Sequence, residues 1–322
     1  MKVTVLALVV LLGSAIQVQL QNAVVQTAGA RYKSIRVLTD IPASMVIPTM
    51  AFVSNALGVT CLQCHTDVYE SDEKPMKDKA RDMIRLTLAL NQREFGGRTV
   101  VTCETCHHGR VVPASVPDLA NAGWMPRAPA VPQVPLPEAS TVLERFAKAV
   151  GAEAFDALWN QQVSGTITRN SGRVAPASAT FELYQEKPAT FRLSTELSHP
   201  PEADAELPMS FLRPPLVAKT YPDLRVVSRA DVNGRATVAA MGTSARGVHT
   251  LYFDAQTGLL VRRSDELATP LGLLPERYDF SDFRRVDGIM VPMKIVWSRA
   301  DYQVSFVADR VRHNVPARGR SR

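Results

Sequence analysis

The reactive side chains of this sequence lie in two short motifs of cysteine and histidine. The motifs are CLQCH and CETCH, and they consist of Cys61, Cys64 and His65 and of Cys103, Cys106 and His107. The chain has four cysteines, so these motifs contain all of them. Two thiols one helical turn apart can form thioethers with the two vinyl groups of haem, and the following histidine then lies beneath the iron. The spacing therefore predicts two covalently bound c-type haems with His65 and His107 as proximal ligands.

The same cysteine pairs allow two other interpretations. Two C-x-x-C pairs can hold a structural zinc ion, and a single pair can act as a redox dithiol. Zinc does not require a histidine directly after each pair, and neither pair lies in the βαβ context of thioredoxin-like motifs. We therefore prefer haem, with zinc as the main alternative.

A helix before the first motif carries a candidate for the sixth iron ligand. Pro48 and Thr49 can start this helix, and Gly58 can end it. Met50 lies on it, 11 residues before Cys61. A chain that turns back at Gly58 returns Met50 to the distal face of the first haem. A methionine ligand raises the reduction potential, which suits electron transfer.

A second amphipathic helix precedes the second motif and ends at Gly96. Met83, Leu86 and Leu90 share one face of it, and Met83 lies 20 residues before Cys103. Each methionine has an alternative role as an ordinary core residue. The rival ligands are Met45, Met76 and His108.

The N-terminus has the pattern of a secretory signal peptide. Met1 and Lys2 precede the apolar run VTVLALVVLLG, and small residues follow. Cleavage after Ala15 or after Ala30 fits this pattern. An uncleaved anchor is the alternative, although the run is short for a membrane span. The prediction is a periplasmic or exported protein.

The remainder of the chain divides by composition. A helical stripe over 140–150 is followed by alternating segments joined at turn signals such as Asn233–Gly234 and Asp287–Gly288. This pattern predicts about nine or ten antiparallel strands behind one helix. The fold class is a mostly α diheme cytochrome c domain followed by an α+β domain with an antiparallel sheet. The predicted boundaries are a signal peptide at 1–30, the diheme domain at 31–112, a Pro-rich linker at 113–137, the sheet domain at 138–315 and a basic tail at 316–322.

Charge gives little indication of a partner. The chain has 37 Lys and Arg against 31 Asp and Glu, which does not indicate nucleic-acid binding. Lys74, Lys77, Lys79 and Arg81 form either a basic docking edge for an acidic redox partner or, as we prefer, a solvated helix start. We interpret His199, His249 and His313 as ordinary polar residues. The sequence shows no Ser/His/Asp arrangement that would indicate hydrolysis.

The haem motifs and their helices resemble a known family. The segments MAFVSNALGVTCLQCH, KARDMIRLTLALN and VTCETCHHGR resemble the haem-binding unit of photosynthetic reaction-centre cytochrome c subunits over residues 40–112. In that family a helix with the distal methionine precedes each motif, so the resemblance implies Met50 on the first iron and Met83 on the second. Reaction-centre members carry four haems and are often lipid-anchored. This chain has two motifs and no anchoring cysteine, so a photosynthetic role does not follow.

The C-terminal region has a second resemblance. LYFDAQTGLLVRR and ERYDFSDFRRVDGIMVP are similar to the late strands of LolA/LppX-type lipoprotein-carrier domains. This similarity implies a curved antiparallel half-barrel over helices, with an apolar concave face. That face would serve as a docking module or would bind an apolar ligand.

These observations favour a periplasmic diheme cytochrome that transfers electrons between redox partner proteins, a membrane electron-transfer complex among them. One alternative is a peroxidase-like haem enzyme with an open site at one iron. The other is a carrier of a lipid or other apolar ligand with accessory haems.

Overall fold

The computed structural model describes residues 26–113, 135–171, 175–186, 190–197, 214–244, 247–299 and 302–316. Residues 1–25 of the predicted signal peptide, 114–134 of the predicted linker and 317–322 of the predicted tail lie outside this set, as does His199. Within the described residues, no helix is both long and apolar enough to cross a membrane.

The N-terminal part of the chain is helical. Its elements are α1 (Ala28–Arg31), η1 (Ala43–Met45), α2 (Val46–Leu57), η2 (Cys61–Gln63), α3 (Pro75–Phe95) and α4 (Cys103–His107). We call residues 26–113 the helical unit. Gly58 ends α2 and Gly96 ends α3, each in the left-handed conformation that glycine adopts without strain. Both predicted helix ends are therefore correct, while α2 begins two residues before Pro48.

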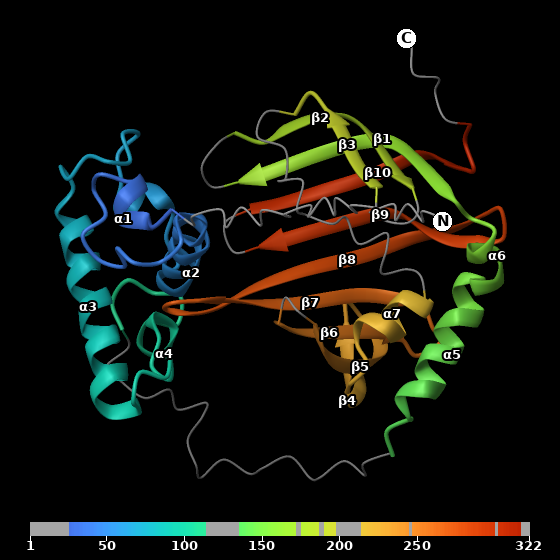
Figure 1. Ribbon diagram of the computed structural model, residues 1–322, viewed down its shortest axis with the longest axis horizontal. Helices are drawn as coiled ribbons and strands as arrows, with labels where there is room; N and C mark the ends of the chain where they lie inside the picture. Colours follow the sequence, from blue (N-terminus) through green and yellow to red (C-terminus); the bar gives the residue numbers. More distant parts are fainter. Residues whose placement is uncertain are drawn as a thin grey trace, which may run out of the picture.

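The C-terminal part is an antiparallel sheet of ten strands in the order β3-β2-β1-β10-β9-β8-β7-β6-β5-β4 (Figure 1). The strands are β1 (Asn160–Ser171), β2 (Ala177–Glu186), β3 (Thr190–Thr195), β4 (Arg225–Val232), β5 (Arg235–Ser244), β6 (Gly247–Asp254), β7 (Leu260–Thr269), β8 (Gly272–Val286), β9 (Ile289–Arg299) and β10 (Tyr302–His313). The predicted antiparallel sheet is thus confirmed. Strand β1 was not predicted as a separate strand, because its sequence is largely polar and its apolar residues alternate weakly.

Two tight turns set the register of this sheet. Asn233 and Gly234 have φ angles of 54° and 79°, and Asp287 and Gly288 have 48° and 82°. Positive φ at both central residues is the type I′ geometry, whose twist matches that of antiparallel strands. These turns join β4 to β5 and β8 to β9.

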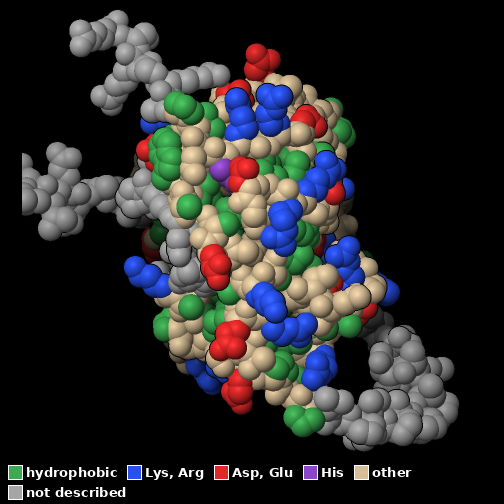
Figure 2. Space-filling model, turned by 90° about the vertical axis from the view of Figure 1, so that its right-hand side faces the viewer, with side chains coloured by type: hydrophobic (Ala, Val, Ile, Leu, Met, Phe, Trp, Pro, Cys, Tyr) green, Lys and Arg blue, Asp and Glu red, His purple; other side chains and the backbone are tan. Residues whose placement is uncertain are grey.

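Helices cover one face of the sheet. They are α5 (Ala139–Val150), α6 (Ala152–Asp156) and α7 (Pro214–Thr220). Phe146 of α5 is fully buried and meets the Phe253 ring of β6 edge to face, with ring centroids 5.4 Å apart. Figure 2 shows the right-hand end of the molecule, where Lys and Arg side chains are spread among apolar and acidic ones. The predicted helix over 140–150 is thus confirmed as α5, which anchors the core.

The β7–β8 hairpin joins the sheet to the helical unit (Figure 1). Leu271 at its turn and Leu274 in β8 are fully buried and form one apolar cluster with Ala51, Phe52 and Ile84 of α2 and α3. A Cβ atom at Gly272 would overlap the Phe52 ring, so the hairpin and α2 are in close contact.

Candidate functional site

The first motif lies on a short turn of helix directly after α2. Gly58 reverses the chain, and residues Cys61–Gln63 form a single 3-10 turn. The backbone N–H of His65 donates to the Cys61 carbonyl oxygen at 3.0 Å. Cys61 and Cys64 are therefore one helical turn apart, with His65 directly behind them.

The second motif forms the five-residue helix α4. Thr102 caps it, because the Thr102 hydroxyl accepts from the Thr105 N–H while the Thr105 hydroxyl accepts from the Thr102 N–H. His108 ends the helix in the left-handed conformation. The cap fixes the turn that holds Cys103 and Cys106.

The two motif histidines are held by the same kind of contact. The Nδ1 atom of His65 lies 3.1 Å from the Tyr69 carbonyl oxygen, and that of His107 lies 2.8 Å from the Arg110 carbonyl oxygen. A carbonyl oxygen only accepts, so Nδ1 carries the proton in each ring. The unprotonated Nε2 is then the nitrogen suited to bind iron, and the carbonyl fixes the ring orientation.

A backbone contact ties the two motifs together. The Gly109 N–H donates to the Ala56 carbonyl oxygen at 2.9 Å, which joins the segment after His107 to the end of α2. A Cβ atom at Gly58 would overlap the Gly109 carbonyl oxygen. The two glycines thus allow close contact between the segments that hold the motifs.

The helices before the motifs carry apolar side chains on the surface. Met83 and Leu86 of α3 are 38% and 59% exposed, and Met50 of α2 is half-buried. Other exposed apolar side chains of the helical unit include Ile47, Leu62, Val68 and Val100. A large apolar group bound to this unit would cover side chains of this kind. The residues present therefore fit haem.

The thiols of Cys64 and Cys103, one in each motif, are partly buried. Burial raises the pKa of the Cys64 and Cys103 thiols, with nearby Lys74 opposing the effect at Cys64. Among the described residues, no three His, Cys, Asp or Glu side chains form a group that could hold a metal ion.

The basic residues at the start of α3 do not form the docking edge considered above. Lys77 and Arg81 are 7% and 5% exposed, and both pair with Asp72. Lys74 donates to the Leu62 carbonyl oxygen within the first motif. Lys79 is exposed. Lys74, Lys77 and Arg81 thus hold the loop around the first motif in place, so the preferred interpretation of a solvated helix start is also wrong for Lys77 and Arg81.

The structure also contains a buried polar cluster that the sequence did not reveal. Ser244 Oγ lies 2.7 Å from His249 Nε2, and His249 Nδ1 lies 2.7 Å from Asp265 Oδ1. This is the order of a Ser-His-Asp triad. However, Arg263 donates to both oxygens of Asp265, so the carboxylate charge is already compensated. The cluster is therefore suited to holding β5, β6 and β7 together.

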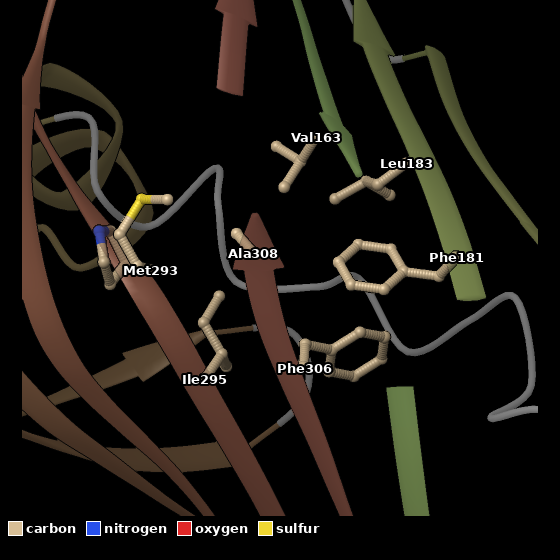
Figure 3. Close-up of a pocket in the computed structure, with 8 residues that line it drawn as sticks. Val163, Phe181, Leu183, Met293, Ile295, Phe306 and Ala308 are labelled. Carbon is tan, nitrogen blue, oxygen red and sulfur yellow. The ribbon is translucent and has the colours of Figure 1, made fainter. Parts of the chain in front are cut away.

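A small apolar cavity is lined by side chains of four neighbouring strands of the sheet. Figure 3 shows side chains of β1, β2, β9 and β10 around it, among them Phe181, Ile295 and Phe306. Its volume is about 10 Å³, which is near the lower limit for one water molecule. An acyl chain would not fit in this cavity unless the strands moved apart.

A match to a known protein family covers the part of the chain that contains both cysteine motifs. A family model described as "Photosynthetic reaction centre cytochrome C subunit" matches residues 14–192, more than half of the chain. The protein belongs to this family. The resemblance noted above is confirmed, and membership implies covalently bound haem c.

A curated relative supports the same assignment. This chain is 29% identical over 89 residues to the photosynthetic reaction center cytochrome c subunit of Rubrivivax gelatinosus. The alignment covers 26% of this chain and 24% of the relative. The chain thus spans about a quarter of the length of the curated relative that it matches.

Solved structures are similar to the sheet. A DUF1329 family protein from Desulfovibrio piger matches with a TM-score of 0.39 and 12% identity, covering 55% of this chain and 93% of that chain. A LolA superfamily protein from Nitrosomonas europaea matches with a TM-score of 0.35 and 11% identity, covering 55% and 93%. At these scores, neither similarity extends to function.

Proposed function

We propose that this protein is a diheme c-type cytochrome that transfers electrons between redox partner proteins. The observation that carries the proposal is the pair of bonds from His65 and His107 to backbone carbonyl oxygens. Each hydrogen bond orients the imidazole of a histidine that directly follows a cysteine pair. Each pair has the spacing of a haem attachment motif.

Each residue of the two motifs has a defined role in this proposal. Haem c supplies a one-electron iron couple when bound. The first haem would be held by Cys61, Cys64, His65 and Met50, and the second by Cys103, Cys106, His107 and Met83. An iron bound by both a histidine and a methionine would have no open coordination site for a substrate.

The contact between Gly109 and Ala56 supports electron exchange between the haems. It joins Ala56 near the end of α2, five residues before Cys61, to the segment that follows His107. The two sites are consequently parts of one helical unit and do not depend on the linker for their placement.

We further propose that the protein works outside the cytosol, in the periplasm or after export. Haem attachment to such motifs, the apolar N-terminal run and family membership agree with this location. Its redox partners include a membrane electron-transfer complex. The sheet would serve as the docking module.

An optical experiment tests this proposal against the haem-enzyme alternative. Protein produced in a haem-attaching host is recorded in the visible and near-infrared ranges, oxidised and reduced. We expect low-spin iron at both sites and the weak charge-transfer band of Met bound to ferric iron. Met50→Ala and Met83→Ala should each remove part of that band, lower one potential and leave the other haem unchanged. High-spin iron at one site of the native protein, together with peroxide turnover, would contradict electron transfer as the primary role.

A further inference from the structure

The two motif histidines differ in what surrounds the carbonyl group that orients them. The Tyr69 carbonyl oxygen lies 3.1 Å from His65 Nδ1 and also accepts from the Lys77 ammonium group at 3.0 Å. Among the described residues, His107 provides the one side-chain donor to the Arg110 carbonyl oxygen. The contact that fixes the proximal ligand therefore includes a cation at the first motif.

Lys77 is held firmly in this position. Its side chain is 9% exposed, and its ammonium group also donates to the Ser71 carbonyl oxygen at 2.8 Å and pairs with Asp72 at 3.1 Å. A buried ammonium group needs such a set of acceptors, because its desolvation is costly without them. All three acceptors lie on the loop between the first motif and α3.

Asp72 compensates only part of this charge. Its carboxylate lies 2.6 Å from Arg36 and 2.7 Å from Arg81, in addition to Lys77. Three cations thus share one carboxylate, and the group as a whole remains positive. Asp78 pairs with Arg81 on the exposed side of this group.

We propose that Lys77 raises the reduction potential of the first haem. The inference rests on the proposed function, since it requires a haem at each motif. Two effects have the same sign. An ammonium group on the Tyr69 carbonyl oxygen weakens that oxygen as an acceptor, so His65 donates less electron density to the iron. The positive charge itself also favours the ferrous over the ferric state, and burial limits its screening by water.

The consequence is a bias on electron transfer within the protein. By raising the potential of the first haem, Lys77 favours movement of an electron from the second haem to the first. Lys77 is a positioning residue in this scheme, because it acts through the Tyr69 carbonyl group and does not touch the iron ligand directly.

Spectroelectrochemical titration of the holoprotein tests the proposal. Lys77→Met should lower the midpoint potential of one haem by on the order of 59 mV, a tenfold change in a one-electron equilibrium constant. The other haem should not move, and Lys77→Arg should restore most of the potential. Lys79→Met is the matched control, because Lys79 lies on the same helix but is exposed. A variant with Cys61→Ala and Cys64→Ala identifies which transition belongs to the first haem.

A second variant covers the possibility that Lys77→Met does not fold. Asp72→Asn removes a negative charge beside Lys77 and should raise the same potential, the opposite sign. Equal shifts in both haems, an equal shift in Lys79→Met, or no shift with two haems bound would overturn the role of Lys77. Failure to find two covalent haems would instead contradict the proposed function, so the two failures are distinguishable.

Discussion

The helical unit and the sheet domain are stabilised in different ways. The sheet domain has an extensive core. Side chains of α5 are buried there together with side chains of strands from both halves of the sheet. The apolar cluster of the helical unit has five buried residues, and two of them, Leu271 and Leu274, come from the sheet domain. Meanwhile Met83 and Leu86 remain exposed on α3. The helical unit is therefore completed in part by the β7–β8 hairpin, and the haems that we propose would cover further apolar side chains of it.

The largest expected effect comes from withholding haem. When the chain is produced in a host that lacks haem attachment, the helical unit should lose most of its amide protection while the sheet domain keeps its own. The reason is that the sheet buries its own core and the helical unit does not. Hydrogen exchange resolved by peptide, compared with the haem-loaded chain, measures this. Equal protection of α2 and α3 with and without haem would contradict the claim that the helical unit depends on haem for its stability.

Truncation of the hairpin contact should have the next largest effect. Leu271 is fully buried between α2 and α3, so Leu271→Ala should reduce the free energy of unfolding of the helical unit by about 2–5 kcal/mol. Denaturant unfolding followed at the haem absorbance measures it. Leu273 is 53% exposed in the same hairpin, and Leu273→Ala should change stability by less than about 0.5 kcal/mol. Similar effects for the two variants would show that the hairpin does not support the helical unit.

A pair of glycines tests the contact between the two motifs. Gly58 and Gly96 both end a helix with φ near 60°, at 65° and 61°. Alanine at either position costs about 1–2 kcal/mol for its backbone conformation alone. A Cβ atom at Gly96 would have no neighbouring atom within 4 Å, whereas a Cβ atom at Gly58 would overlap the Gly109 carbonyl oxygen. Thermal unfolding should therefore show a larger loss for Gly58→Ala, and equal losses would argue against close contact there.

The smallest expected effect is a loss of stability of the helical unit at low pH. Hydrogen bonds from Arg81 and Lys77 lower the pKa of Asp72 from 3.8 to about 2. Because the folded pKa is depressed, the stabilisation is present above pH 3.8 and is lost as the pH falls toward 2. Unfolding of the helical unit followed between pH 5 and 2 should show this loss, and Asp72→Asn should flatten the curve over that range. An unchanged slope in Asp72→Asn would mean that this carboxylate does not contribute.

Local signals in the sequence predicted much of this molecule. The glycines that end α2 and α3, the Asn233–Gly234 and Asp287–Gly288 turns and the spacing of the cysteines each depend on a few neighbouring residues. The antiparallel sheet followed from the turns and is confirmed. The family resemblance rested on the segments around the cysteine motifs and is confirmed as well. The haem ligands themselves stay a prediction.

The features that the sequence did not reveal depend on distant residues. Lys77 and Arg81 looked like part of an exposed charge run, because their partners are backbone carbonyl groups and Asp72 in a folded loop. Ser244, His249 and Asp265 meet through the pairing of three strands, which no local pattern indicates. Leu271 at a hairpin turn gives no sign that it packs against α2, more than 200 residues earlier.

The most direct test of the account is a count of covalent haems by intact-protein mass spectrometry. The protein is produced in a haem-attaching host, alongside one variant with both Cys61 and Cys64 replaced by Ala and another with both Cys103 and Cys106 replaced. A diheme cytochrome should carry two haems on the native chain and one on each variant. A native chain with fewer than two covalent haems, or with zinc bound across both cysteine pairs, would contradict it.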